Sequence, residues 1–410
     1  MNNRILIIGL VWPEPTSSAA GWRMLQLIDE LKKIATDIHF ACAAAKSVAS
    51  HPLANEQIVE HSIVLNDSLF NDFVRELQPS IVVYDRFLIE EQFGWRVKQE
   101  LPHALTVLDT EDLHFVRRAR TVAYRNNTEI DYDTADCHRE LAAIHRCDVS
   151  LIISPFEYDL LVHQFQIPKV QLLYLPFIEQ HLSEAYFQSL PTFDQRKNIV
   201  FIGNFIHEPN YETVLQLKKM WPLIRKRLKN VELHIYGAYP SQKINQLQNT
   251  SEGFIIKGAA ENVNTTMQNY RVLAAPIPFG AGLKGKFIDG FKNNLPNVTT
   301  SIGSEGIATA NWAGFVADQP EDFVNAVCEL YNNERIWNES VLNGYRIINQ
   351  YFSNQIWNGV LATTLLSIQK QISIHRKKLP IQKMLWHHSL QSIKYMSLWI
   401  ETKNKLHNNR

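Results

Sequence analysis

The segment that decides the fold is residues 271–301, RVLAAPIPFGAGLKGKFIDGFKNNLPNVTTS. It opens with an apolar run (271–277), closes with a second one (297–301), and has a helix-patterned stretch between them. Two short apolar runs joined by a helix are typical of neighbouring parallel strands. The loop before the helix, residues 280–286, holds three glycines and two lysines. Glycines let backbone amides approach an anion, and a helix N-terminus carries about half a positive charge, so this loop predicts a phosphate site.

The same alternation of strand and helix continues in both directions from this segment. In the first half of the chain the expected strands are RILIIGLV (4–11), DIHFACA (37–43), SIVVYD (80–85), ALTVLDT (104–110) and VSLIIS (149–154). In the second half they are NIVFIG (198–203), VELHIYG (231–237), GFIIKG (253–258) and the two runs quoted above. Near-continuous apolar strands alternating with amphipathic helices predict parallel sheets covered on both faces. The fold class is therefore α/β, with two Rossmann-like doubly wound domains that face a cleft.

Composition shifts set the expected domain boundaries. Residues 1–178 form the N-terminal domain, the polar stretch 179–196 is a linker, and residues 197–355 form the C-terminal domain. A helix over 356–375 is expected to return to the first domain, followed by a basic amphipathic tail at 376–410. In doubly wound sheets ligands bind at the carboxyl ends of the strands, so the cleft between the domains is the expected site.

Length and composition point to an ordinary globular protein. The 410 residues are 45% hydrophobic and 20% charged, and the four cysteines are scattered without metal-ligand spacing. Such cysteine usage favours a reducing compartment. The run ILIIGLVW (5–12) lacks a small-residue cleavage site, so we interpret it as a core strand and not as a signal peptide. No apolar stretch approaches the roughly 20 residues of a membrane span. We expect a cytoplasmic protein.

The formal charge is zero overall but is unevenly distributed. Residues 371–410 hold eight Lys or Arg and one acidic residue, a net of +7, so residues 1–370 carry −7. Basic residues with tryptophan on an amphipathic helix can lie on an anionic membrane. Packing on the protein itself, or dimerisation, explains the pattern equally well. Contact of residues 376–410 with the inner face of a membrane is therefore one of two hypotheses for the tail. We expect no nucleic-acid partner.

Several common nucleotide-binding classes are excluded by missing motifs. Neither domain opens with a G-x-G-x-x-G turn, which argues against a dinucleotide-dependent dehydrogenase. The chain also lacks a G-x-x-x-x-G-K-[ST] loop, a G-x-S-x-G elbow and an H-E-x-x-H motif. After these exclusions, the predicted phosphate site at 280–286 is the motif from which a function can be inferred.

The segment GAGLKGKFIDGFKNNLPNVTTSIGSEGI (280–307) resembles the donor-binding segment of GT-B glycosyltransferases, most closely those of glycosyltransferase family 4. VFIGNFIHEPNYETV, ELHIYGAYP and VLDTEDLHFVRRAR resemble other parts of the same family, so the resemblance covers most of residues 4–360. It implies transfer of a sugar from a nucleotide-diphosphate sugar to a glycan or glycolipid, with retention of configuration. The nucleotide sugar is then a substrate; no cofactor and no obligatory metal are expected.

The donor side is expected to stabilise a diphosphate leaving group with cations and amides. Lys284 and Lys286 would supply the charge, and Asp289, where the family normally has a glutamate, would accept hydrogen bonds from the ribose. The full set of expected donor-binding residues is Gly203, Asn204, Gly282, Lys284, Gly285, Lys286, Asp289, Ser304 and Gly306.

The first domain is expected to shape the acceptor side and to handle the acceptor proton. The candidate catalytic residues are His114, Asp112 and Glu305, and the candidate acceptor-side residues are Gly21, Asp85, Arg86, Asp109 and Glu111. Arg117, Arg118 and Arg120 are expected to form a solvated face, with contact to an anionic acceptor as the alternative.

Two departures from the family pattern leave alternatives open. Ala281 stands in place of the first of two family glutamates, and GNFIHEPN lacks the arginine common near the start of the second domain. The chain is therefore an active glycosyltransferase, a catalytically silent GT-B subunit that binds a partner glycosyltransferase or a glycan, or a nucleotide-sugar epimerase or hydrolase.

Overall fold

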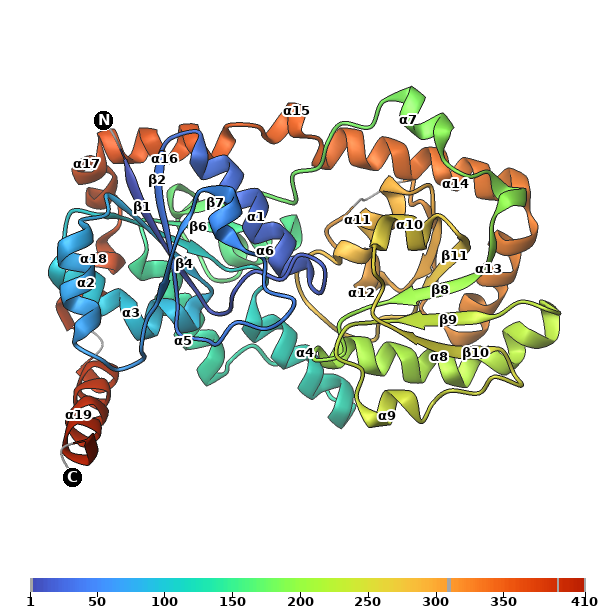
Figure 1. Ribbon diagram of the computed structural model, residues 1–410, viewed down its shortest axis with the longest axis horizontal. Coiled ribbons are helices and arrows are strands. Elements are labelled where there is room, and N and C mark those ends of the chain that lie inside the picture. The colour runs from blue at the N-terminus through green and yellow to red at the C-terminus, as the bar shows by residue number, and fades with distance from the viewer. Residues whose placement is uncertain (1–2, 308–310, 389–390, 409–410) are drawn as a thin grey trace.

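The computed structural model describes residues 3–307, 311–388 and 391–408. It has two α/β domains side by side, each built on its own parallel sheet (Figure 1). This confirms the fold class predicted from the alternating pattern.

The first sheet has seven parallel strands in the order β3-β2-β1-β4-β5-β6-β7. They are β1 (Arg4–Gly9), β2 (Asp37–Cys42), β3 (Val59–Ser62), β4 (Ile81–Asp85), β5 (Leu105–Asp109), β6 (Val149–Ile152) and β7 (Leu172–Tyr174). The helices are α1 (Ala19–Lys32), α2 (Leu69–Leu77), α3 (Phe87–Glu100), α4 (His114–Asn126), α5 (Ala135–Arg146) and α6 (Pro155–His163). Alternate side chains of β1 enter separate cores on the two faces, with Ile5 and Ile7 on one and Leu6 and Ile8 on the other. Burial on both faces explains why β1 reads as an unbroken apolar run.

The second sheet has six parallel strands in the order β10-β9-β8-β11-β12-β13. They are β8 (Lys197–Ile202), β9 (Leu233–Tyr236), β10 (Phe254–Gly258), β11 (Tyr270–Ala275), β12 (Asn297–Thr299) and β13 (Gly314–Val316). The helices are α8 (Glu208–Arg227), α9 (Gln242–Asn245), α10 (Val263–Met267), α11 (Gly285–Lys292), α12 (Ser301–Ser304), α13 (Pro320–Asn332) and α14 (Glu334–Ile347). In both sheets the strand order reverses beside the first strand of the domain, which places a ligand crevice at the carboxyl ends of the strands.

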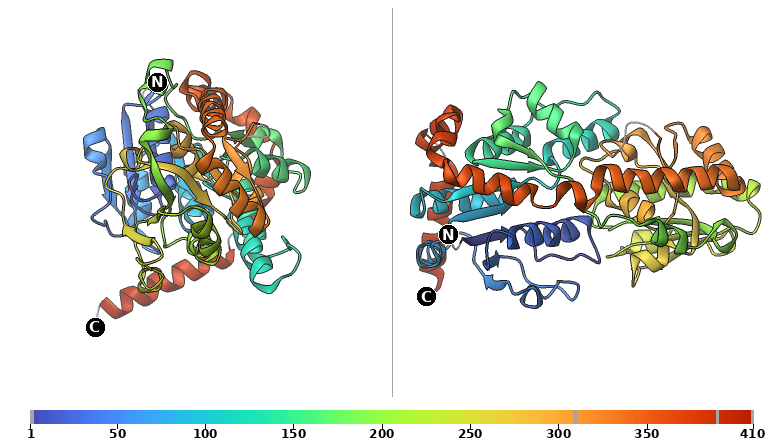
Figure 2. Two further views of the ribbon diagram at one scale, coloured as in Figure 1. Left: turned by 90° about the vertical axis from the view of Figure 1, so that its right-hand side faces the viewer. Right: turned by 90° about the horizontal axis from the view of Figure 1, so that it is seen from above.

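Two segments connect the domains. The expected linker, residues 179–196, contains the short helix α7 (Glu184–Ser189). After α14 a helical path runs through α15 (Asn354–Trp357) into α16 (Val360–Lys370) and crosses back to the first domain (Figure 2). Leu361 and Leu365 of α16 are buried in the core that holds Ile5 and Ile7. The crossing helix is thus part of the first domain's core.

The expected helix 356–375 is broken after Lys370, and three helices follow into the basic tail: α17 (Ile372–Lys377), α18 (Pro380–His388) and α19 (Gln391–Asn408). Residues 389–390 and 409–410 of the tail lie outside the described residues. Helix α18 packs on α5, and the Trp386 indole N–H donates to the carbonyl oxygen of Arg146 at 3.0 Å. Helix α19 extends away from the body of the first domain (Figure 1). None of the described helices is long and apolar enough to cross a bilayer.

Candidate functional site

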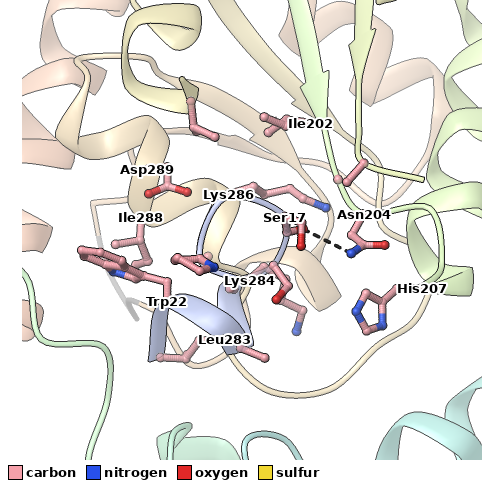
Figure 3. A pocket seen from close by; sticks show the side chains of 18 of the residues that line it. Ser17, Trp22, Ile202, Asn204, His207, Leu283, Lys284, Lys286, Ile288 and Asp289 are labelled. Atoms are coloured by element: carbon pink, nitrogen blue, oxygen red, sulfur yellow. Dashed lines mark hydrogen bonds between the residues drawn. The ribbon is translucent and has the colours of Figure 1, made fainter. Parts of the chain in front are cut away.

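A pocket of about 690 Å³ lies between the domains, at the carboxyl ends of both sheets. Segments that follow β1, β5 and β7 form one wall, and segments that follow β8, β9, β10 and β11 form the other. Figure 3 shows side chains from both walls turned toward the same space. The location agrees with the cleft expected from the strand pattern.

The glycine-rich loop brings the N-terminus of α11 to the pocket. Lys284 is the N-cap of this helix, and its side chain does not cap a backbone amide. Gly282 has φ +62°, and a Cβ on it would lie 2.8 Å from Cβ of Asp112 in the first domain. A side chain at this position would therefore push the loop away from the opposite wall.

Lys284 and Lys286, separated by Gly285, both line the pocket, and the pKa of each ammonium group is lowered. Burial lowers the pKa of Lys284 to about 8, although the Glu305 carboxylate favours its charged form. Burial and the neighbouring charge of Lys284 lower the pKa of Lys286 to about 7. Lys286 Nζ donates to Oδ1 of Asn210 at 2.6 Å and lies 4.7 Å from the ring centroid of Phe201. An anion placed here would relieve the cost of two buried cations.

The segment after β8 forms a second corner of the pocket. Gly203 leaves room for Asn210, because a Cβ on Gly203 would lie 2.6 Å from Cγ of Asn210. Asn204 Nδ2 donates across the cleft to the carbonyl oxygen of Ser17 at 3.2 Å, as Figure 3 shows. His207 directly precedes α8 and lines the pocket without capping the helix, and burial lowers its pKa. The nearby charge of Lys286 lowers this pKa as well, so a neutral imidazole stands on this side of the pocket.

An ion-pair network closes the other end of the pocket. Lys292 Nζ lies 2.8 Å from Oε2 of Glu179 and 3.3 Å from Oδ1 of Asp289. The Trp22 indole N–H donates to Oε1 of Glu179 at 3.1 Å. Burial raises the pKa of Asp289, whereas Lys292 acts in the opposite direction. Asp289 therefore presents carboxylate oxygens to the pocket on the helix that carries the two lysines.

Residues 196–333 match the family model described as glycosyl transferases group 1. The match covers most of the second domain, about a third of the chain. The loop 280–286, Asp289 and the corner at Gly203 all lie within the matched residues.

Comparison with whole proteins extends the likeness to the fold of both domains. A Klebsiella pneumoniae protein, described as an uncharacterized 44.6 kDa protein in the cps region, is 26% identical over 175 residues. That match covers 40% of this chain and 45% of the relative, which is less than half of its length. Anabaena HepE, solved with UDP and glucose, superposes with a TM-score of 0.67 at 14% identity, covering 89% of this chain and all of that one. S. aureus TarM, in a complex that includes UDP, gives 0.56 at 13%, covering 73% and 58%. The chain thus has the two-domain GT-B fold.

The first domain contributes two carboxylates to the pocket, opposite the second domain. Glu111 lines the pocket with φ +61°, and burial raises its pKa to about 7 while the Arg86 charge acts against this. Asp112 forms an ion pair with Arg117, which also lines the pocket. The Asp112 Oδ1 atom is buried without a hydrogen-bond partner. These groups form the wall nearest the glycine-rich loop.

Other residues expected at the site lie behind the pocket wall. His114 lies 3.6 Å from Asp112, and burial lowers its pKa to about 3, so its imidazole is neutral. Asp109 is held by the buried guanidinium of Arg23 at 3.0 and 3.1 Å. Asp85 accepts from the Leu10 amide at 3.0 Å, and Arg86 lies 3.6 Å from Asp85. Asp85 thus ties the end of β4 to the segment after β1, and Asp109 ties the end of β5 to α1.

Of the other expected residues, Gly285 lines the pocket, whereas Gly21, Ser304 and Gly306 do not. Gly21 is buried in α1, where a Cβ would lie 2.4 Å from the backbone of Glu14, so it positions the loop at 15–18 that does line the pocket. Gly285 faces Ala19 across the cleft. Ser304 and Gly306 lie outside the pocket wall, and a Cβ on Gly306 would lie 2.5 Å from Oγ of Ser154.

Two buried residues of the first domain hold the glycine-rich loop and were not expected at the site. The Arg120 guanidinium pairs with both oxygens of Glu305 at 2.7 and 2.8 Å and donates to the carbonyl oxygen of Gly280 at 2.7 Å. The solvated role expected for Arg120 is wrong, because its side chain is only 6% exposed. Glu157 Oε1 accepts from the amides of Gly282 and Leu113 at 2.8 and 3.0 Å. The residues that flank Arg120 and Glu157 in the sequence do not indicate either contact.

Proposed function

We propose that the protein transfers a sugar from a nucleotide-diphosphate sugar to a glycan or glycolipid acceptor in the cleft between its domains. The observation that carries this is the pair Lys284 and Lys286 at the uncapped N-terminus of α11, both with lowered pKa values and both lining the interdomain pocket. Paired cations and helix amides suit a diphosphate.

The reaction breaks the bond between the anomeric carbon and the β-phosphate oxygen, and the electron pair stays on the diphosphate. Lys284 and Lys286 would stabilise that charge as it develops. The acceptor hydroxyl oxygen forms the new bond, and its proton passes to a pocket carboxylate or to the leaving phosphate. Of the expected catalytic residues, Asp112 lines the pocket, His114 lies behind Asp112, and Glu305 supports the charge of Lys284.

Relatives support this choice of substrates. HepE was solved with UDP and glucose, and TarM with UDP, so the fold accommodates a uridine diphosphate in both. The Klebsiella pneumoniae relative is described by its place in a cps region, which favours a glycan as the acceptor. Retention of configuration, independence from metals and a cytoplasmic location belong to the same proposal.

The first experiment is nucleotide binding by thermal shift and calorimetry with UDP, GDP, ADP and CMP, each with and without Mg²⁺. A ligand that binds only the native state stabilises it by RT ln(1 + [L]/Kd), about 2.7 kcal/mol at a hundredfold excess over Kd. We expect one nucleoside diphosphate to stabilise the wild type without Mg²⁺. Lys284→Ala should lose most of this shift, whereas Lys226→Ala, which removes an exposed lysine of α8, should keep it. Failure of every nucleotide to bind at millimolar concentration would exclude a donor site.

The pH dependence of binding gives an independent check on the lysines. Both ammonium groups are charged below their pKa values of about 8 and about 7, so the protein binds the diphosphate best when both are protonated. The affinity should therefore fall as the pH rises from 7 to 9, by up to about tenfold per pH unit for each lysine that must be charged. Lys286→Ala should bind weakly with a shallower pH profile.

One observation favours a second candidate function, a catalytically silent GT-B subunit: Ala281 stands where the family has its first glutamate. A silent subunit would neither transfer nor hydrolyse a nucleotide sugar. Release of nucleoside diphosphate from the matching sugar nucleotide, measured with and without acceptor extract, separates the two. No release from a donor that binds would favour the silent subunit.

A further inference from the structure

Helix α19 turns polar side chains toward the protein. The buried guanidinium of Arg96, on α3, donates to Oγ of Ser397 at 3.3 Å and to Oε2 of Glu401 at 3.2 Å. Ser397 and Glu401 are spaced four residues apart, so they lie on one face of the helix. This polar face attaches α19 to the first domain.

The opposite face of α19 is apolar and exposed. Tyr395, Trp399 and Leu406 are 61%, 59% and 65% exposed. Their spacings of four and seven residues place them on a single stripe, about 160–200° around the helix from Ser397. A helix that packs only on its own protein buries its apolar stripe, and α19 does the reverse. We therefore expect the exposed stripe to bind a second apolar surface, either a lipid membrane or another copy of the helix.

The charge of the tail favours a membrane over a second copy of the helix. Residues 371–410 carry a net charge of +7, whereas the rest of the chain carries −7. The Nζ of Lys403 lies 5.3 Å from the ring centroid of Trp399, so a cation flanks the apolar stripe. Residues 391–408 themselves hold Lys394, Lys403 and Lys405 against Glu401, a net of +2, so two copies of α19 packed face to face would bring like charges together. Tryptophan and tyrosine flanked by lysine instead suit the interface of an anionic bilayer.

We propose that α19 docks the protein on an anionic lipid membrane through Tyr395, Trp399 and Leu406. The helix projects beyond the first domain in Figures 1 and 2, so a flat surface can reach this stripe without moving the domains. The proposal goes beyond sugar transfer, and its test requires no nucleotide sugar.

The test is flotation of the full-length protein with vesicles of phosphatidylcholine alone or of phosphatidylcholine with about 40% phosphatidylglycerol, which gives a negative surface potential. We expect binding to the anionic vesicles and at least about tenfold weaker binding to the neutral ones. Trp399→Gln combined with Leu406→Gln should lower the partition coefficient at least about tenfold, because each change removes an exposed apolar group. Added salt should weaken binding, since the attraction is partly electrostatic.

The matched control is Leu223→Gln, which makes the same change on α8 at a leucine that is 55% exposed. It should leave vesicle binding unchanged, and melting curves of all variants should match the wild type because every changed side chain is exposed. Equal vesicle binding by the double variant and the wild type would overturn the proposal. So would a wild-type dimer in sedimentation velocity that the double variant converts to a monomer, since the stripe would then be a contact between copies.

Discussion

Glu157 is a buried carboxyl group whose protonation matters to the glycine-rich loop. Burial and the nearby Asp112 charge raise its pKa to about 8, although the amides of Leu113 and Gly282 favour the ionised form. Its Oε2 atom is buried without a hydrogen-bond partner. Near neutral pH the side chain is therefore a neutral acid that accepts two amide hydrogen bonds through one oxygen.

This leads to a prediction about stability and pH. Because the folded pKa of about 8 exceeds the ordinary value of 4.5, the contribution of Glu157 to stability is complete below pH 4.5 and is lost as the pH rises through 8. Glu157→Gln keeps an accepting oxygen and cannot ionise. The free energy of unfolding of the variant should therefore increase relative to that of the wild type as the pH rises, by on the order of 1.4 kcal/mol per pH unit between the two pKa values. Urea unfolding at pH 5, 7 and 9 measures it.

The control for this change is Glu76→Gln, at an exposed carboxylate of α2. Its difference from the wild type should stay nearly constant over the same pH range. Parallel stability curves for Glu157→Gln and the wild type would show that Glu157 is ionised in the folded protein at pH 7.

The residues predicted from sequence and those missed differ in how their roles arise. Lys284, Lys286 and Asp289 share one loop and one helix, so their common location follows from local spacing. Glu157 and Arg120 act on backbone groups 125 and 160 residues away in the chain. A charged residue in an amphipathic helix is usually solvated. Sequence pattern alone therefore could not identify these two as buried supports of the loop.

At the scale of elements, the glycine-rich loop at 280–286 determines how close the two walls of the pocket come. The buried strands were predictable because they are apolar throughout, and α11 begins at Gly285, within the expected segment. The edge strands β3, β7 and β13 were not predicted, because each is only three or four residues long and at most one of its residues is buried. Burial thus explains both the strands that were predicted and those that were missed.

The loop gives a second prediction. Gly282→Ala places a methyl group where φ is +62° and Asp112 Cβ is 2.8 Å away, so the loop must move from the first domain. We expect nucleoside diphosphate affinity to fall at least about tenfold, since Lys284 is carried by this loop. Isothermal titration measures the change.

Gly359→Ala is the matched control for this glycine. Gly359 has φ +79° and no atom within 4 Å of an added Cβ, and it lies at the start of α16, away from the pocket. It should cost about 1–2 kcal/mol of stability for the left-handed backbone and leave affinity unchanged. If both variants bind alike, the approach of Asp112 to Gly282 does not position the loop.

For the whole molecule, the relation between the two domains depends on a few polar contacts across the cleft and on the crossing helix α16. Arg120 makes the densest of these described contacts, since one guanidinium holds Glu305 and Gly280 of the second domain. Asn204 with Ser17, and Lys292 with Glu179, hold other parts of the same cleft. A donor that touches both walls requires these contacts to keep the pocket at its present width.

The third prediction is that Arg120→Ala opens the cleft. Glu305 would be left partly buried without its cation, and breaking a buried pair in this way costs about 3–5 kcal/mol. The domains can avoid that cost by separating, so solvent reaches Glu305. We expect a larger radius of gyration by small-angle X-ray scattering and weaker diphosphate binding. Saturating diphosphate should reduce the difference in radius, because a ligand held by both walls favours the closed arrangement.

Arg118→Ala is the control on the same helix. Arg118 is 48% exposed and pairs with Asp136 inside the first domain, so its loss removes a cation without touching the cleft. The radius of gyration and the affinity should then match the wild type. If Arg120→Ala also leaves both unchanged, the domains are held by α16 and the linker alone. The pair of Arg120 with Glu305 would then support Lys284 locally and would not set the width of the cleft.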